Sequence, residues 1–224
     1  MCFSATASFT AAGVLSVMGM LTIKAARTRE LRLFASIPLF FALQQLLEGM
    51  VWVTLMGSQT ESFVHLVALY GFLFFAGVFW PIWIPGLLYR LEEQDSRKRI
   101  LKGFLSIGFL ISSFYLLVLV LIGSDVQMVG HHLAYPFPTE RYQHIATAYG
   151  ETIYYTLLAL YVTVIVGACF TSSFPRVWIF GLFVGIALIL AHIFYAFALG
   201  SVWCYFSALI SGVIYFVVKK IPAR

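Results

Sequence analysis

The sequence predicts an all-α, polytopic membrane protein built as a bundle of seven transmembrane helices. Composition is the first reason: hydrophobic residues make up 62% of the 224 residues and charged residues only 10%, whereas about a quarter of the residues in a soluble domain are charged. A soluble fold of this size has too little interior to bury so many apolar side chains. The second reason is the length of the apolar stretches, because a helix needs about 20 residues to cross the hydrocarbon core.

Seven stretches are long enough, and we expect helices at about 4–23, 33–57, 62–89, 101–123, 148–170, 177–198 and 200–218. Together they form a single transmembrane domain over 1–224, with an external loop at 124–147. Pro81 and Pro85 predict a kink or tilt in the third helix. The last two stretches meet around Gly200, and the apolar run is too long for one helix, so we expect a tight hairpin there.

Lysine and arginine predict the orientation. Under a seven-helix count, thirteen of the 14 basic residues lie on one side of the membrane and only Arg141 lies on the other. Cytoplasmic connections carry the excess of positive charge, so the N-terminus is expected outside and the C-terminus in the cytoplasm. The first stretch has its positive residues behind it, which predicts an uncleaved anchor rather than a signal peptide.

The net charge of +5 does not indicate nucleic acid as a partner. The basic residues form short clusters between apolar stretches, which is the pattern of a membrane protein. We therefore expect membrane lipids, and a small molecule or ion, as partners.

Three ionisable side chains lie well inside the apolar stretches: Glu48, His65 and His192. Such residues are costly in lipid and are functional candidates by default. With a helical rise of about 1.5 Å per residue, all three fall in the outer half of the bundle, Glu48 and His192 at similar depths. The side chains expected to share a pocket with them are Gln44, Gln45, Trp52, Tyr195 and Cys204.

The sequence leaves several interpretations of this pocket open. Glu48, His65 and His192 could bind zinc or another divalent metal and leave one position for water, as a membrane hydrolase acting on lipid requires. Glu48 could instead pair with His192, Tyr195 or Gln44 and fix helix packing. Our first expectation is a pocket that binds or transports a small molecule, ion or lipid; an interaction subunit without a ligand is a further alternative.

Two other features concern the outer side. Cys2 and Cys204 could form a disulfide there or remain packed free thiols. The proline-containing segment 132–138 reads as an extended or turn segment that could form a lid over the pocket.

Four sequence segments carry a family resemblance: Met1–Phe9 (MCFSATASF), Gln44–Trp52 (QQLLEGMVW), Trp80-Pro81 and Trp203-Cys204. They resemble a family of uncharacterised bacterial multi-helix membrane proteins, classed as a domain of unknown function. The resemblance covers nearly the whole chain and implies a multi-pass protein of the bacterial inner (cytoplasmic) membrane. It implies no established activity.

Overall fold

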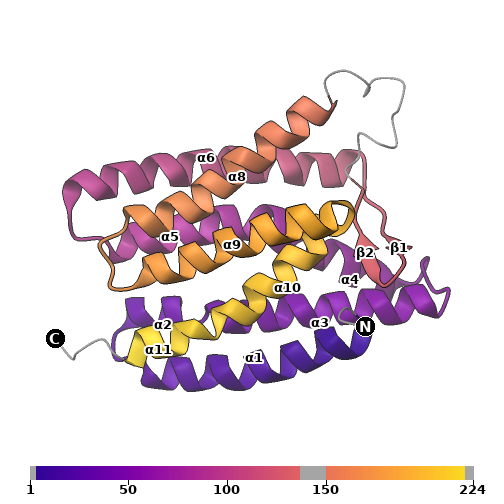
Figure 1. Ribbon diagram of the computed structural model, residues 1–224, viewed down its shortest axis with the longest axis horizontal. Coiled ribbons are helices and arrows are strands. Elements are labelled where there is room, and N and C mark those ends of the chain that lie inside the picture. Colours follow the sequence, from indigo (N-terminus) through magenta and orange to yellow (C-terminus); the bar gives the residue numbers. More distant parts are fainter. Residues whose placement is uncertain (1–3, 137–149, 220–224) are drawn as a thin grey trace.

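The computed structural model describes residues 4–136 and 150–219 as a bundle of long helices with one short β-hairpin at one end (Figure 1). The elements follow in the order α1 (Ala5–Ala25), α2 (Arg29–Ala35), α3 (Ile37–Met56), α4 (Phe63–Leu73), the π-helix η1 (Phe74–Phe79), α5 (Trp80–Leu91), α6 (Asp95–Leu121), β1 (Gln127–Val129), β2 (His132–Ala134), α8 (Gly150–Thr171), α9 (Val177–Tyr195), the 3-10 helix η3 (Ala196–Ala198), α10 (Leu199–Ser211) and α11 (Val213–Lys219).

Six segments of the described chain are long and apolar enough to cross a membrane, which confirms the all-α membrane class. They are Ala5–Ala25, Arg29–Met56, Phe63–Leu91, Asp95–Leu121, Thr152–Thr171 and Val177–Lys219. The last segment has 43 residues, about twice the length that one crossing needs.

The long segment Val177–Lys219 reverses direction near its centre. Tyr195 (φ −141°, ψ 39°) and Ala198 (φ −122°, ψ 27°) depart from helical geometry on either side of η3. As a result α9 and α10 pack against each other and run back along the bundle from a shared turn beside the β-hairpin (Figure 1).

Hydroxyl side chains start three of the helices. The side chains of Ser4, Thr28 and Ser62 accept hydrogen bonds from backbone N–H groups in the first turns of α1, α2 and α4, at 3.1–3.2 Å. An N-cap of this kind satisfies a donor that the helix itself leaves unpaired. These residues therefore fix where the helices begin.

The third crossing is irregular just before Pro81. Here the helix widens into the π-helix η1 before α5 begins, and side chains of neighbouring helices donate hydrogen bonds to carbonyl groups of η1. The Tyr161 hydroxyl of α8 donates to the Ala76 carbonyl (2.5 Å), and the Ser112 hydroxyl of α6 donates to the Val78 carbonyl (2.8 Å). A π-helix in a membrane needs such partners, because lipid offers none.

Gly108 lets α6 approach α5 closely. A Cβ atom at this position would lie 2.0 Å from the Pro81 carbonyl oxygen. That carbonyl has no N–H donor four residues on, because Pro85 occupies the position. The absent side chain of Gly108 is therefore what allows the two backbones to meet.

At the end of the bundle opposite the hairpin, Glu92 connects two loops by hydrogen bonds. This side chain is only 2% exposed, and its carboxylate accepts hydrogen bonds from the Ser173 N–H and hydroxyl (both 2.6 Å) and from the Gln94 N–H (3.1 Å). Burial alone would raise the pKa of Glu92, but the hydrogen bonds from Ser173 and Gln94 outweigh it and lower the pKa below its ordinary value. The α5–α6 connection is thereby joined to the α8–α9 connection.

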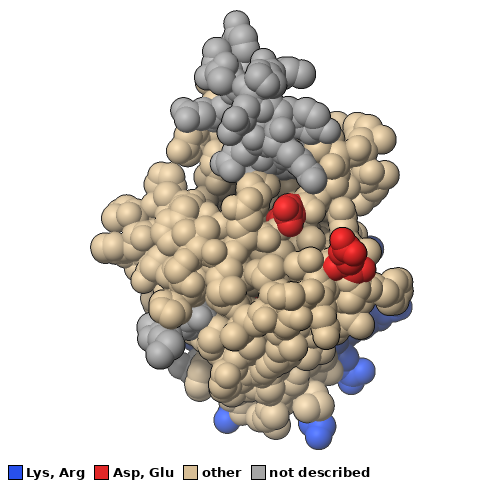
Figure 2. Space-filling model, turned by 90° about the vertical axis from the view of Figure 1, so that its right-hand side faces the viewer, with Lys and Arg blue, Asp and Glu red and all other residues tan. Residues whose placement is uncertain are grey.

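Positive charge gathers at this same end. The described Lys and Arg residues lie in or beside the connections at the left of Figure 1: Lys24, Arg27, Arg29, Arg32, Arg90, Arg97, Lys98, Arg99, Lys102, Arg176 and Lys219. The opposite end, which faces the viewer in Figure 2, shows acidic side chains, and blue appears only at its margins. The charge asymmetry of the sequence is thus an asymmetry between the two ends of the bundle.

Candidate functional site

A cavity of about 190 Å³ lies in the half of the bundle next to the hairpin. It is lined by residues of α4, η1, α6, α8 and the start of α10, and by the residue after β2. Most of its wall is aliphatic or aromatic carbon. The lining side chains that carry a hydroxyl, indole N–H or thiol group are Tyr115, Tyr135, Tyr154, Tyr161, Trp203 and Cys204.

Local structure explains how two of these tyrosines reach the cavity. Tyr115 packs its ring directly on Gly77 of the π-helix, where a Cβ atom would lie 2.0 Å from the ring. Tyr135 stacks on Phe72, with ring centroids 4.8 Å apart and an interplanar angle of 22°. The π-helix and α4 thus provide the surfaces on which both phenol rings lie.

The hairpin holds Tyr135 over the bundle. Val129 pairs with His132 across a two-residue turn in which Gly130 has φ +61°, a conformation typical of tight hairpins. The His132 ring lies against Tyr195 at 4.8 Å. Burial, with a smaller contribution from His131, lowers the pKa of His132.

The Tyr135 hydroxyl is a buried polar group in the cavity wall. It has no hydrogen-bond partner among the described residues, whereas Tyr161 donates to Ala76 and the Trp203 indole N–H donates to the Val184 carbonyl at 3.0 Å. A buried hydroxyl without a partner costs about 1–3 kcal/mol. A ligand that accepts or donates one hydrogen bond at Tyr135 would recover part of that cost.

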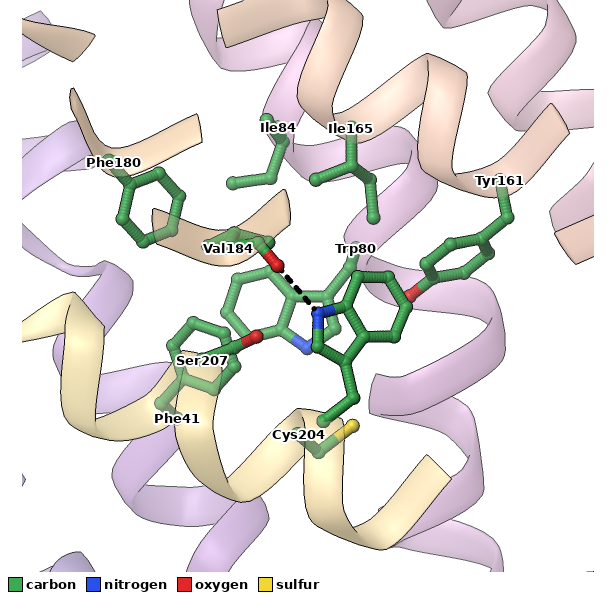
Figure 3. Close-up of a pocket in the computed structure, with 10 residues that line it drawn as sticks. Phe41, Trp80, Ile84, Tyr161, Ile165, Phe180, Val184, Cys204 and Ser207 are labelled. Carbon is green, nitrogen blue, oxygen red and sulfur yellow. Dashed lines mark hydrogen bonds between the residues drawn. The ribbon is translucent and has the colours of Figure 1, made fainter. Parts of the chain in front are cut away.

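A second cavity of about 30 Å³ continues the first along α10 and shares Tyr161, Trp203 and Cys204 with it. In Figure 3, Tyr161 of α8 and Cys204 of α10 point toward this space from different helices, and Trp80 of α5 lies across it. Its volume is of the order needed for one water molecule.

Glu48 of α3 contacts α10, the helix that contributes Trp203 and Cys204 to both cavities. It is 1% exposed and accepts hydrogen bonds from the Ser201 hydroxyl (2.5 Å) and the Gln45 side-chain amide (3.1 Å). Both donors are neutral. Ser201 is the neighbour in sequence of Gly200, which lines the larger cavity.

The two glutamines before Glu48 extend this buried polar cluster. Gln44 accepts a hydrogen bond from the Trp80 indole N–H at 2.8 Å. The Gln44 side chain lies within reach of the Cys204 thiol, and the buried Gln45 Oε1 atom has no hydrogen-bond partner among the described residues. Glu48 is also close enough to Tyr135 and Cys204 for electrostatic interaction, so the polar cluster and the cavity are neighbours.

The structure does not assemble the metal site considered from the sequence. His65 is buried and bonded through Nδ1 to the Thr54 hydroxyl at 2.7 Å. His192 lies exposed on α9, its ring edge-on to Tyr155 at 6.2 Å. Within residues 4–136 and 150–219, no group of three His, Cys, Asp or Glu side chains could hold a metal ion. Glu48, His65 and His192 do not form such a group in the described part of the chain.

Within the described residues, the partners of Glu48 differ from His192, Tyr195 and Gln44, the three considered from the sequence. Its hydrogen bonds go to Ser201 and Gln45, because the face of α9 that bears His192 is turned outward. Of the remaining expected pocket residues, Cys204 lines the cavity. Trp52 is buried in the core and Tyr195 contacts His132.

Two sequence expectations fall outside the described residues. Cys2 is one partner of the considered disulfide, and Cys204 is a free thiol in the structure. The part of the expected lid beyond Pro136 also lies outside; its described part contains β2 and Tyr135.

Sequence reasoning missed the residues that contribute most to the cavity and to the Glu48 cluster: Tyr115, Tyr135, Tyr161 and Ser201. The signal for two of them was present, since Tyr115 and Tyr161 are phenols inside otherwise apolar stretches. A buried tyrosine hydroxyl needs a partner. Tyr135 and Ser201 offered no comparable signal.

The fold and the cavity define a multi-pass helical membrane protein with a pocket lined by several tyrosines. The chain belongs to a family of unknown function, DUF6629, whose family model matches residues 1–224. The resemblance to an uncharacterised family is thereby confirmed. Searches among curated proteins and among solved structures found no match.

Proposed function

We propose that this protein binds a small, mostly apolar molecule that carries one hydrogen-bonding group. The observation that supports this most directly is the cavity of about 190 Å³ with the unpaired Tyr135 hydroxyl in its wall. An apolar protein cavity of about 150 Å³ is large enough for benzene. A single ring with a hydroxyl or carbonyl, or a short section of a lipid chain with such an end, matches this space.

We propose further that the chain crosses the membrane seven times, with its N-terminus outside and its C-terminus in the cytoplasm of a bacterial cell. The reversal between α9 and α10 supports counting two crossings within Val177–Lys219. The gathering of Lys and Arg at one end supports the direction, because positive loops face the cytoplasm. In this orientation the cavity lies in the outer half of the bundle.

Cysteine labelling tests the orientation. In a background without native cysteines, Gln127→Cys in β1 should react with a membrane-impermeant maleimide in intact cells, and Ser96→Cys in α6 should react only after the membrane is opened. Both positions are exposed in the structure. Labelling of position 96 from outside would contradict the seven-crossing topology.

Quenching of tryptophan fluorescence tests the ligand site. The probe is 4-bromophenol, with bromobenzene as the comparison that lacks the hydroxyl. Because bromine quenches at short range and Trp203 lines the cavity, saturable quenching is expected in the purified protein and should be much weaker in Trp203→Phe. The phenol should bind about fivefold to tenfold more tightly than bromobenzene, as one hydrogen bond warrants.

Three variants make this test specific. Tyr135→Phe should remove the preference for the phenol. Gly200→Leu should block binding of both probes, because Gly200 lines the cavity and its Cβ has open space. Gly13→Leu, where a Cβ likewise meets nothing, is the matched control and should bind normally. Equal, unsaturable quenching in all variants would indicate that the probes only dissolve in the detergent.

A further inference from the structure

A groove lies at the end of the bundle opposite the cavity, where α5 ends and α6 begins. It has a volume of about 430 Å³ and is lined by Tyr89, Asp95, Lys98, Arg99 and Lys102. We refer to these five residues as the basic groove. Three cations and one carboxylate give it a formal charge of +2, so it is built to attract an anion.

The cations of the basic groove are free to bind one. Lys98 is half-buried, with Nζ 5.3 Å from the centre of the Tyr89 ring, a cation–π contact that holds the ammonium group in place. The side chains of Arg99 and Lys102 are exposed and make no hydrogen bond or ion pair with the described residues. By contrast, neighbouring Arg97 is engaged, since it donates to the Thr171 carbonyl at 3.1 Å.

The groove lies where α6 begins a candidate membrane span, which indicates an anion that is attached to hydrocarbon chains. Lys98 and Lys102 lie one turn apart on the same face, at the start of the apolar segment Asp95–Leu121. Further along this face of α6 most exposed side chains are apolar, among them Phe109 (51% exposed) and Leu116 (44% exposed). A ligand with a phosphate at one end and hydrocarbon chains at the other would satisfy both parts of this surface.

We propose that the basic groove binds the phosphate headgroup of an anionic phospholipid, whose acyl chains lie along the exposed apolar face of α6. The headgroup phosphate accepts hydrogen bonds from Arg99 and Lys102, and Lys98 contributes its charge from above Tyr89. Basic pockets at the ends of transmembrane helices bind lipid headgroups by this chemistry. This site is independent of the cavity and of its ligand.

Thermal unfolding of the detergent-purified full chain tests the proposal, with dioctanoyl phosphatidylglycerol as the probe. Dioctanoyl phosphatidylcholine and inorganic phosphate are the comparison ligands. The anionic lipid should raise Tm in a saturable way, whereas the zwitterionic lipid and free phosphate at equal concentration should not. The triple variant Lys98→Gln, Arg99→Gln, Lys102→Gln should weaken binding of the anionic lipid by about a hundredfold.

The matched control is a second triple variant, Lys24→Gln, Arg27→Gln, Arg29→Gln. It removes the same charge from exposed positions of another basic cluster at the same end, so it should keep wild-type affinity. The proposal is overturned if both triple variants lose affinity equally, which would indicate only the overall charge. It is also overturned if phosphatidylcholine or free phosphate gives the same rise in Tm as phosphatidylglycerol.

Discussion

Gly108→Ala is expected to destabilise the bundle by about 3 kcal/mol or more, although it adds a single methyl group. The added Cβ would lie 2.0 Å from the Pro81 carbonyl oxygen, which is a backbone atom and has no rotamer by which to move away. Helices α5 and α6 would have to separate, and overpacking of this kind costs about 1–3 kcal/mol even where side chains can give way. Thermal unfolding in detergent, followed by circular dichroism, measures the loss.

Gly103→Ala is the control, because both glycines belong to α6. A Cβ at position 103 meets nothing within 4 Å, and alanine is favoured over glycine in a helix by about 1 kcal/mol. This variant is expected to be as stable as the wild type or slightly more stable. Equal destabilisation by both substitutions would mean that α6 itself, rather than its contact with Pro81, is sensitive.

The class of the fold could be predicted because it depends on composition. An excess of apolar residues that no soluble fold of this length can bury leaves only the membrane, and lipid leaves mainly helices. The π-helix η1 could not be predicted in the same way. Its carbonyl groups are satisfied by Tyr161 and Ser112, which belong to helices distant in sequence.

The candidate site shows a similar division. Glu48, Gln44 and Gln45 could be singled out because polar side chains are costly in an apolar stretch, and the structure places them in one buried cluster. The partner of Glu48 could not be identified. In a helix that is apolar all round, hydrophobic periodicity does not indicate which face turns inward. Consequently the sequence alone could not show that His192 faces outward and Ser201 inward.

Glu48→Leu is expected to cost about 3 kcal/mol of stability, because it removes the acceptor of two buried hydrogen bonds. The Ser201 hydroxyl and the Gln45 amide N–H would lose their partner, and each unsatisfied donor costs about 1–3 kcal/mol. Among the described residues the Gln45 Oε1 atom already lacks a partner, so that side chain would have no hydrogen bond there at either end of its amide. Thermal unfolding again provides the measurement.

Glu48→Gln should be much milder and separates the shape of the side chain from its charge. The new amide keeps an oxygen that can accept from Ser201. Its NH2 group faces the Gln45 amide, which can rotate by a half-turn and present the oxygen that is now unpaired. We therefore expect a loss of about 1 kcal/mol or less. A loss as large as that of Glu48→Leu would mean that the carboxylate charge itself is required.

A double-mutant cycle with Ser201 establishes whether the contact between α3 and α10 accounts for the effect. Ser201→Ala should cost about 1 kcal/mol, whereas Ser211→Ala, a buried serine of the same helix bonded only to the Ala208 carbonyl, should cost less. Because Ser201→Ala removes the hydroxyl that Glu48→Leu leaves unsatisfied, the double variant Glu48→Leu, Ser201→Ala should be at least as stable as Glu48→Leu alone. Strictly additive losses would show that Glu48 and Ser201 act independently, and the cavity wall would then lose its link to the buried carboxylate.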